Sequence, residues 1–194
     1  MATADLYRLA GIASWVALVA LVLSGVALAL FFGGAGEFWG PVNDALIVLT
    51  SIALVPVVIA VARLAGDAAT PWVGIVTVAA VAGLILIGVG QTLLIVGRLS
   101  LDGSYVTGGI GVVPFLAWVV LVAVLSLGSG VLPSSVGWLA VASLGLVVVM
   151  SVIAALTQGP ILWAAGIALV VAFSAWFAGL ASTFGSTAVA VAGS

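Results

Sequence analysis

The second half of the sequence carries no charge. From Gly103 to the last residue, Ser194, there is no Asp, Glu, Lys, Arg or His. Charged residues make up about 25% of an average soluble chain, whereas here they make up only 4% of 194 residues, and 66% are hydrophobic. Such a chain would aggregate in water, but its apolar surface suits the lipid tails of a bilayer. The sequence therefore predicts an integral membrane protein.

Turn-forming residues divide the apolar sequence into six segments. A membrane-spanning helix needs about 20 predominantly apolar residues, and each segment is close to that length. We predict an all-α, polytopic transmembrane helix bundle that forms one domain over residues 1–194, with six helices at about 9–32, 44–63, 71–98, 110–127, 136–156 and 160–183. The glycine-rich stretch 103–111 is predicted to be a flexible connection, and residues 184–194 a frayed tail.

The only basic residues are three arginines, and they bear on orientation. An even number of helices places both termini on one side of the membrane. With the termini in the cytoplasm, Arg8 and Arg63 lie inside and Arg98 lies outside, so the preference of basic residues for the cytoplasmic side favours this arrangement two to one. We therefore expect a multi-pass protein of the cell membrane with cytoplasmic termini.

The residue types that do not occur in the sequence restrict the classes of function that the protein can have. The chain has no histidine, no cysteine and no lysine. It therefore lacks the imidazole and thiolate ligands that zinc, haem and iron–sulfur sites use, and the lysine needed for a Schiff base. No pair of carboxylates falls on one buried helix face. We expect no enzyme, no metal and no cofactor, and the net charge of −2 argues against nucleic-acid binding.

Two segments carry small residues in alternating steps of three and four, the spacing of one helix face. In lipid, helices associate through close backbone approach and dispersion, which small residues allow. The stripes can be intramolecular packing faces, an oligomer interface, or an accident of an alanine-rich composition. The candidate packing residues are Ala13, Ala17, Ala20 and Ser24 in the first segment, and Ala168, Ala172, Ala175 and Gly179 in the sixth.

Three further residues are candidates for a polar or functional role. Gln91 is an amide inside the third segment, so it either binds a solute or forms an interhelical hydrogen bond. Pro56 interrupts the second segment, where it either frees a carbonyl for an ion or only bends the helix. Asp44 could sit at a cavity mouth or, beside Asn43, cap a helix N-terminus. We expect Gln91 to face the bundle.

A short stretch between the fourth and fifth segments, Ser129 to Ala140, reads Ser-Gly-Val-Leu-Pro-Ser-Ser-Val-Gly-Trp-Leu-Ala. It resembles a family of bacterial and archaeal six-helix membrane proteins grouped as a domain of unknown function. The start of the first segment, Arg8-Leu-Ala-Gly11, is also similar to that family. Family members often have arginine after the proline, where this chain has Ser134. The resemblance implies six helices and supplies no catalytic residue.

Two functions remain open from the sequence. The first is a non-enzymatic protein dominated by packing, either an accessory subunit of a larger membrane complex or a homo-oligomer. The second is a small transporter or channel for a neutral or apolar solute, or the substrate-binding membrane component of an importer, built around Gln91 and Pro56. A hydrated cavity that reaches Gln91 would favour transport, and a dry core would favour the accessory role. In both cases the bilayer is the immediate partner.

Overall fold

The computed structural model describes residues 3–66, 70–156 and 160–193. These residues form six helices and no strand, and each helix is long and apolar enough to cross a membrane. The all-α, six-helix class predicted from the sequence is thus confirmed. The helices are α1 (Thr3–Phe32), α2 (Trp39–Ala65), α3 (Pro71–Ile95), α4 (Leu101–Gly128), α5 (Ser134–Leu156) and α6 (Pro160–Ala192).

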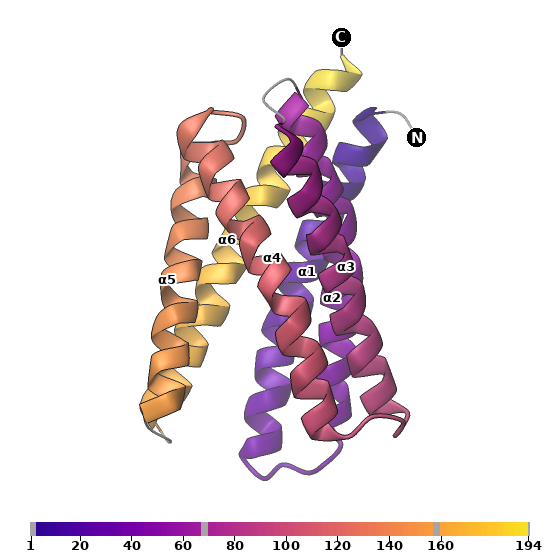
Figure 1. The fold of residues 1–194 in the computed structure, drawn as a ribbon, viewed down its shortest axis with the longest axis vertical. Coiled ribbons are helices and arrows are strands. Elements are labelled where there is room, and N and C mark those ends of the chain that lie inside the picture. The colour runs from indigo at the N-terminus through magenta and orange to yellow at the C-terminus, as the bar shows by residue number, and fades with distance from the viewer. Residues whose placement is uncertain (1–2, 67–69, 157–159, 194) are drawn as a thin grey trace.

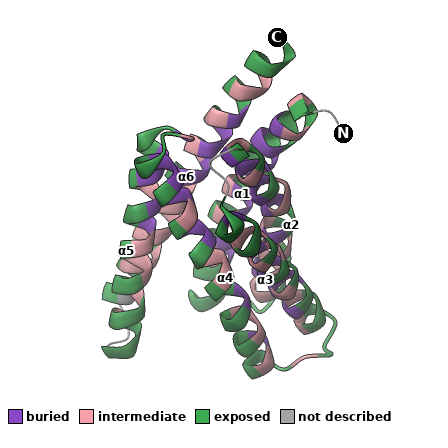
Figure 2. Ribbon diagram, turned by 45° about the horizontal axis from the view of Figure 1, so that its top comes forward, coloured by how far each residue is buried: buried purple, intermediate pink, exposed green. Residues whose placement is uncertain are grey.

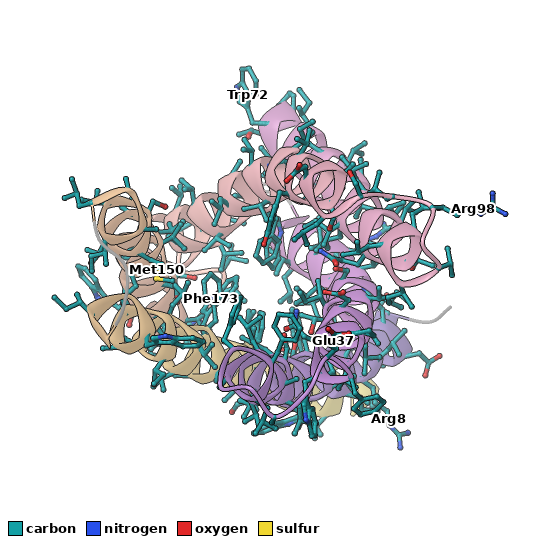
Figure 3. All side chains as sticks on the ribbon, turned by 90° about the horizontal axis from the view of Figure 1, so that it is seen from below. Arg8, Glu37, Trp72, Arg98, Met150 and Phe173 are labelled. Carbon is teal, nitrogen blue, oxygen red and sulfur yellow. The ribbon has the colours of Figure 1, made fainter. Side chains whose placement is uncertain are left out.

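The helices form a closed ring. Each packs against its neighbours in sequence, and α6 returns to pack against α1. Across the ring, the described backbones come close only between α2 and α4. Both termini lie at the same end of the bundle (Figure 1). We call this the terminal end. The opposite end carries the α1–α2 and α3–α4 connections, where Arg98 points outward (Figure 3).

A single hydrophobic core includes residues from all six helices. A regular ring of six cylinders encloses a space as wide as one more cylinder, and packed helices lie about 8–10 Å apart. Large side chains are therefore needed inside such a ring. The largest fully buried ones are Trp118, Trp176 and Phe184. The outer faces, which would meet lipid, are mostly exposed (Figure 2).

The glycine-rich stretch is helical, so the prediction of a flexible connection there is wrong. The helix α4 begins at Leu101, where the Ser100 side chain caps it by accepting a hydrogen bond of 3.2 Å from Gly103 N. Glycine serves here to bring two backbones together. A Cβ added to Gly111 would lie 2.6 Å from Gly83 O of α3, so no larger residue fits at this contact.

Three other helix ends lie well away from their predicted positions. The helix α6 continues to Ala192, so the predicted tail is helical. Its Thr183 and Thr187 hydroxyls donate to the backbone carbonyls of Gly179 and Thr183, which lets polar side chains stay in a long apolar helix. At the other ends, α1 begins at Thr3 and α2 at Trp39, both earlier than predicted.

Candidate functional site

The packing stripe of α1 lies inside the protein. Ala13, Ala17, Ala20 and Ser24 are all buried. Gly11 belongs to the same buried face, and a Cβ added to it would lie 3.4 Å from Ala181 O of α6. The two backbones therefore approach closely at this point, as small residues allow in membrane helices.

The stripe of α6 behaves differently, and the prediction is wrong at Ala175, which is exposed. The other members, Ala168, Ala172 and Gly179, are only partly buried. The reason is that the bulky residues of α6, and not its small ones, determine which face of the helix turns inward. The fully or nearly fully buried side chains of α6 are Trp176, Phe177, Leu180 and Phe184, with Ala181 beside them. Burying aromatic rings fills the ring interior and gains far more contact than burying alanines.

Gln91 lies near the end of α3 and is partly buried, with its amide oxygen enclosed by protein. No described residue makes a hydrogen bond to this Oε1 atom, so the amide oxygen takes no part in an interhelical bond. The hydroxyls of Thr92 and Thr107 are already committed to other acceptors. Thr92 donates to Gly88 O, and Thr107 of α4, which faces Gly90, points its hydroxyl at the carbonyls of Gly103 and Ser104.

Pro56 lies inside α2, which continues without interruption to Ala65. The nearby hydroxyls of Thr50 and Ser51 donate to the carbonyls of Leu46 and Ile47, one turn earlier in the same helix. Pro56 therefore does not divide α2 into two half-helices of the kind that hold ions in transporters.

Asp44 lies in the second turn of α2, because the helix begins at Trp39. It is therefore not an N-cap, and the capping interpretation is wrong. Its Oδ1 accepts a bond of 3.3 Å from Asn43 Nδ2, while Asn43 Oδ1 accepts a buried bond of 2.6 Å from Ser24 Oγ of α1. This Ser24–Asn43 bond links two helices, and the sequence interpretation missed it because Asn43 was placed outside the helix.

Gln91, Asp44 and Pro56 do not converge on one site. A Cβ added to Gly88 would lie 3.8 Å from Cβ of Ser51, which sets the register of the antiparallel helices α2 and α3. At a rise of about 1.5 Å per residue, this register places Gln91 roughly 6 Å from the level of Asp44 and 12 Å from the level of Pro56. The three residues occupy separate positions along the bundle.

Two grooves run between helices, and both are apolar. One lies between α2 and α3 and has a volume of about 310 Å³. Its only polar side chains are Ser51 and Thr92, and both hydroxyls donate within their own helices. Gln91 does not line it. The second groove, of about 380 Å³, lies between α1 and α2 and is lined entirely by apolar residues such as Trp15.

An aromatic cluster joins α4 to α6 inside the ring. The rings of Trp118 and Trp176 have centroids 5.6 Å apart; Phe115 stacks on Trp118 at 5.7 Å, and Phe173 and Phe177 surround Trp176 at 5.8 and 5.5 Å. The indole nitrogens of Trp118 and Trp176 are buried, and neither has a hydrogen-bond partner among the described residues. The sequence holds no sign that these N–H groups would be left unpaired.

The described residues offer little reaction chemistry. No group of three or more His, Cys, Asp or Glu side chains among them could hold a metal ion. The fold defines the class: an α-helical, multi-pass membrane protein whose polar side chains bond mainly to their own helices. In comparisons with family models, curated proteins and solved structures, nothing matched the chain.

Proposed function

We propose that this protein is a non-enzymatic membrane component that works by associating with other helices in the bilayer, as an accessory subunit or a homo-oligomer. The observation that carries the proposal is a set of outward-facing helical glycines. Gly109 of α4 and Gly145 of α5 are exposed, and a Cβ at either position would meet nothing within 4 Å. Glycine costs a helix about 1 kcal/mol relative to alanine. Within one chain these glycines gain no contact in return, whereas a second helix could approach them closely.

Self-association in a bilayer tests this proposal. The chain is labelled with one fluorophore and its stoichiometry is counted by single-molecule photobleaching in liposomes. Gly109→Leu and Gly145→Leu block close approach, so at least one should lower the oligomeric fraction, while Val120→Leu, on an exposed position of α4, should leave it unchanged. If the chain is monomeric on its own, the same variants are compared by the amount of another membrane subunit that co-purifies with them. At least one glycine variant should then lower this amount, and Val120→Leu should not. If both leucine variants match the parent protein in both assays, the proposal fails.

A second candidate is a carrier or channel for a neutral or apolar solute, or the membrane component of an importer. The groove between α2 and α3 supports it, because an apolar lining suits an apolar guest. Flux of a labelled solute into proteoliposomes tests this function. Replacement of the groove residue Gly88 by leucine should block flux, and equal flux through the variant and the parent protein would exclude the groove as the route.

The proposed location is the cell membrane, with both termini in the cytoplasm. The arginine distribution supports it, since Arg8 lies near the start of α1 and Arg63 in the last turn of α2, both at the terminal end. Arg98 follows α3 at the opposite end (Figure 1). The chain has no cysteine, so single cysteines report orientation cleanly. In intact cells an impermeant maleimide should label Ala35→Cys at the opposite end and spare Ser129→Cys at the terminal end. The reverse pattern would invert the topology.

A further inference from the structure

Asp44 is a carboxylate without a charged partner inside a membrane-spanning helix. Its Oδ1 accepts the bond from Asn43, and it makes no other hydrogen bond or ion pair with the described part of the chain. The residue is only partly buried, so a ligand can reach it. An ionisable residue within a transmembrane segment is costly and commonly marks the site or path of a charged ligand. The carboxylate therefore suits a cation that comes from outside this chain.

The charges around Asp44 are mostly of its own sign. Arg98 is the only arginine at the opposite end, and it points outward, away from the bundle (Figure 3). Glu37 and Asp102 also lie at this end, next to the α1–α2 and α3–α4 connections. The described residues of the opposite end thus carry three acidic groups and one basic group. Such an excess of negative charge attracts cations and repels anions.

Asp44 lies on the face of α2 that forms the groove between α2 and α3. The α2 residues that line this groove are Val48, Ser51, Ile52 and Val55. Val48 follows Asp44 by four residues, and Ser51 and Val55 follow in steps of three and four, the spacing of one helix face. Asp44 does not itself line the groove. It lies one turn beyond Val48, at the end of the groove that is nearer the opposite end.

The size and lining of the groove suit an alkyl chain. From Val48 to Val55 the helix rises roughly 10 Å, and an extended chain advances roughly 1.2 Å per bond, so about nine bonds fit along it. The groove has a volume of about 310 Å³. The hydroxyls of Ser51 and Thr92 donate within their own helices and offer no hydrogen to a guest. An apolar chain therefore loses no hydrogen bond by lying there.

The depth of Asp44 fits the head group of an amphiphile. The helix α2 has 27 residues, so it is about 40 Å long, whereas the hydrocarbon core of a bilayer is about 30 Å thick. If α2 is centred, about 5 Å projects from each face of the core. Asp44 lies about 8 Å from the first residue of α2, just inside the core boundary. An amphiphile in a leaflet has its head at this depth and its chain towards the middle, where the groove runs.

We propose that Asp44 and the groove between α2 and α3 form a binding site for a single-chain cationic amphiphile. Its ammonium head lies against the Asp44 carboxylate, and its alkyl chain lies in the groove. A phospholipid fits less well, because its phosphate would meet the acidic excess of the opposite end. The site does not depend on the exposed glycines proposed above for association. Its guest is charged, unlike the neutral solute of the second candidate function.

A pair of probes with the same chain tests the site. Decyltrimethylammonium is cationic and decyl sulfate is anionic. Each is equilibrated by dialysis with the full chain in dodecyl maltoside micelles, whose neutral heads do not compete for a carboxylate, and uptake by empty micelles is subtracted. The cation should bind saturably, one molecule per chain, and decyl sulfate at least tenfold more weakly. Equal binding of the two probes, or uptake of the cation no greater than that of empty micelles, would overturn the proposal.

An amide substitution tests the carboxylate. Asp44→Asn keeps the shape of the side chain and an oxygen that can accept from Asn43, and it should weaken binding of the cation at least tenfold. The matched control is Glu37→Gln, which removes one negative charge from an exposed position at the same end and should change the affinity less than twofold. Circular dichroism checks that both variants fold. Equal affinities of the two variants would contradict a specific role of Asp44.

A groove-filling substitution tests the position of the alkyl chain. Val89 lines the groove and is exposed, so Val89→Phe can fill part of the groove without disturbing the core. It should weaken binding of decyltrimethylammonium at least threefold. Val78→Phe, on an exposed position of α3 outside the groove, should bind as the parent protein does. Unchanged affinity in a folded Val89→Phe variant would show that the chain does not lie in the groove and would overturn the proposed site.

Discussion

The helix α4 makes two contacts of opposite kind. Against α3 it presents glycine, and the backbones at Gly83 and Gly111 meet with no room for a Cβ atom. Against α6 it presents Trp118, whose ring lies 5.6 Å from that of Trp176. Since lipid tails are as apolar as leucine, helices in a membrane gain from tight packing and not from burial alone. The contact with α3 is tight because its glycines have no side chains. The contact with α6 is tight because large side chains fill the ring interior.

The largest expected effect is at the aromatic contact. Trp118→Ala would remove a fully buried ring from a core that all six helices share. We expect the free energy of unfolding to fall by about 3–5 kcal/mol, as for other large-to-alanine core changes. Unfolding in mixed micelles, followed by circular dichroism, measures this. A loss below about 1 kcal/mol would mean that Trp118 is not packed as described.

Overpacking the glycine contact should come next. Gly111→Val places a branched side chain against Gly83 O and Ile87, and we expect a loss of roughly 1–3 kcal/mol in the same assay. The exposed Gly109, two residues earlier, provides a control. Gly109→Ala meets nothing and should raise stability by up to about 1 kcal/mol through helix propensity. Equal effects of the two changes would remove the distinction between a packed and a free glycine.

The same comparison explains what the sequence could predict. Long apolar segments are sufficient to locate six helices, and regular small residues identified the buried face of α1. Glycine is ambiguous, since it marks both turns and close helix contacts, so the start of α4 was misplaced. The inward face of α6 was predicted wrongly at Ala175, because the aromatic residues of this helix, and not its small ones, face inward. The contact between Trp118 and Trp176 depends on helix register, which a single sequence does not show.

A smaller effect should separate the two alanine stripes. Ala20 is buried against its neighbours, so Ala20→Leu should overpack and cost about 1–3 kcal/mol. Ala175 is exposed, and Ala175→Leu should change stability by less than about 0.5 kcal/mol. Thermal unfolding in detergent compares the two variants. Similar losses at both positions would show that α6 also packs through its small residues.

The smallest effect concerns the bond between α1 and α2. Ser24→Ala removes the hydroxyl that donates to Asn43, and interhelical bonds in membranes are worth about 0.6 kcal/mol on average. Asn43→Ala should cost a similar amount, and the double variant should cost less than the sum, because the two side chains bond each other. Strict additivity in the mixed-micelle assay would show that the bond contributes nothing.

Closure of the ring by α6 against α1 brings Trp176 to Trp118 and encloses the aromatic cluster, and it can be measured directly. A Cβ on Gly25 would lie 3.5 Å from Cγ2 of Val170. The cysteine-free chain allows Gly25→Cys and Val170→Cys to be combined and oxidised in native membranes, with Gly25→Cys and the exposed Val171→Cys as the control pair. If the ring is closed, the pair at residues 25 and 170 should form an intramolecular disulfide, and the control pair at residues 25 and 171 should cross-link only weakly. Failure of the first pair to cross-link, or cross-linking only between chains, would contradict the closed ring.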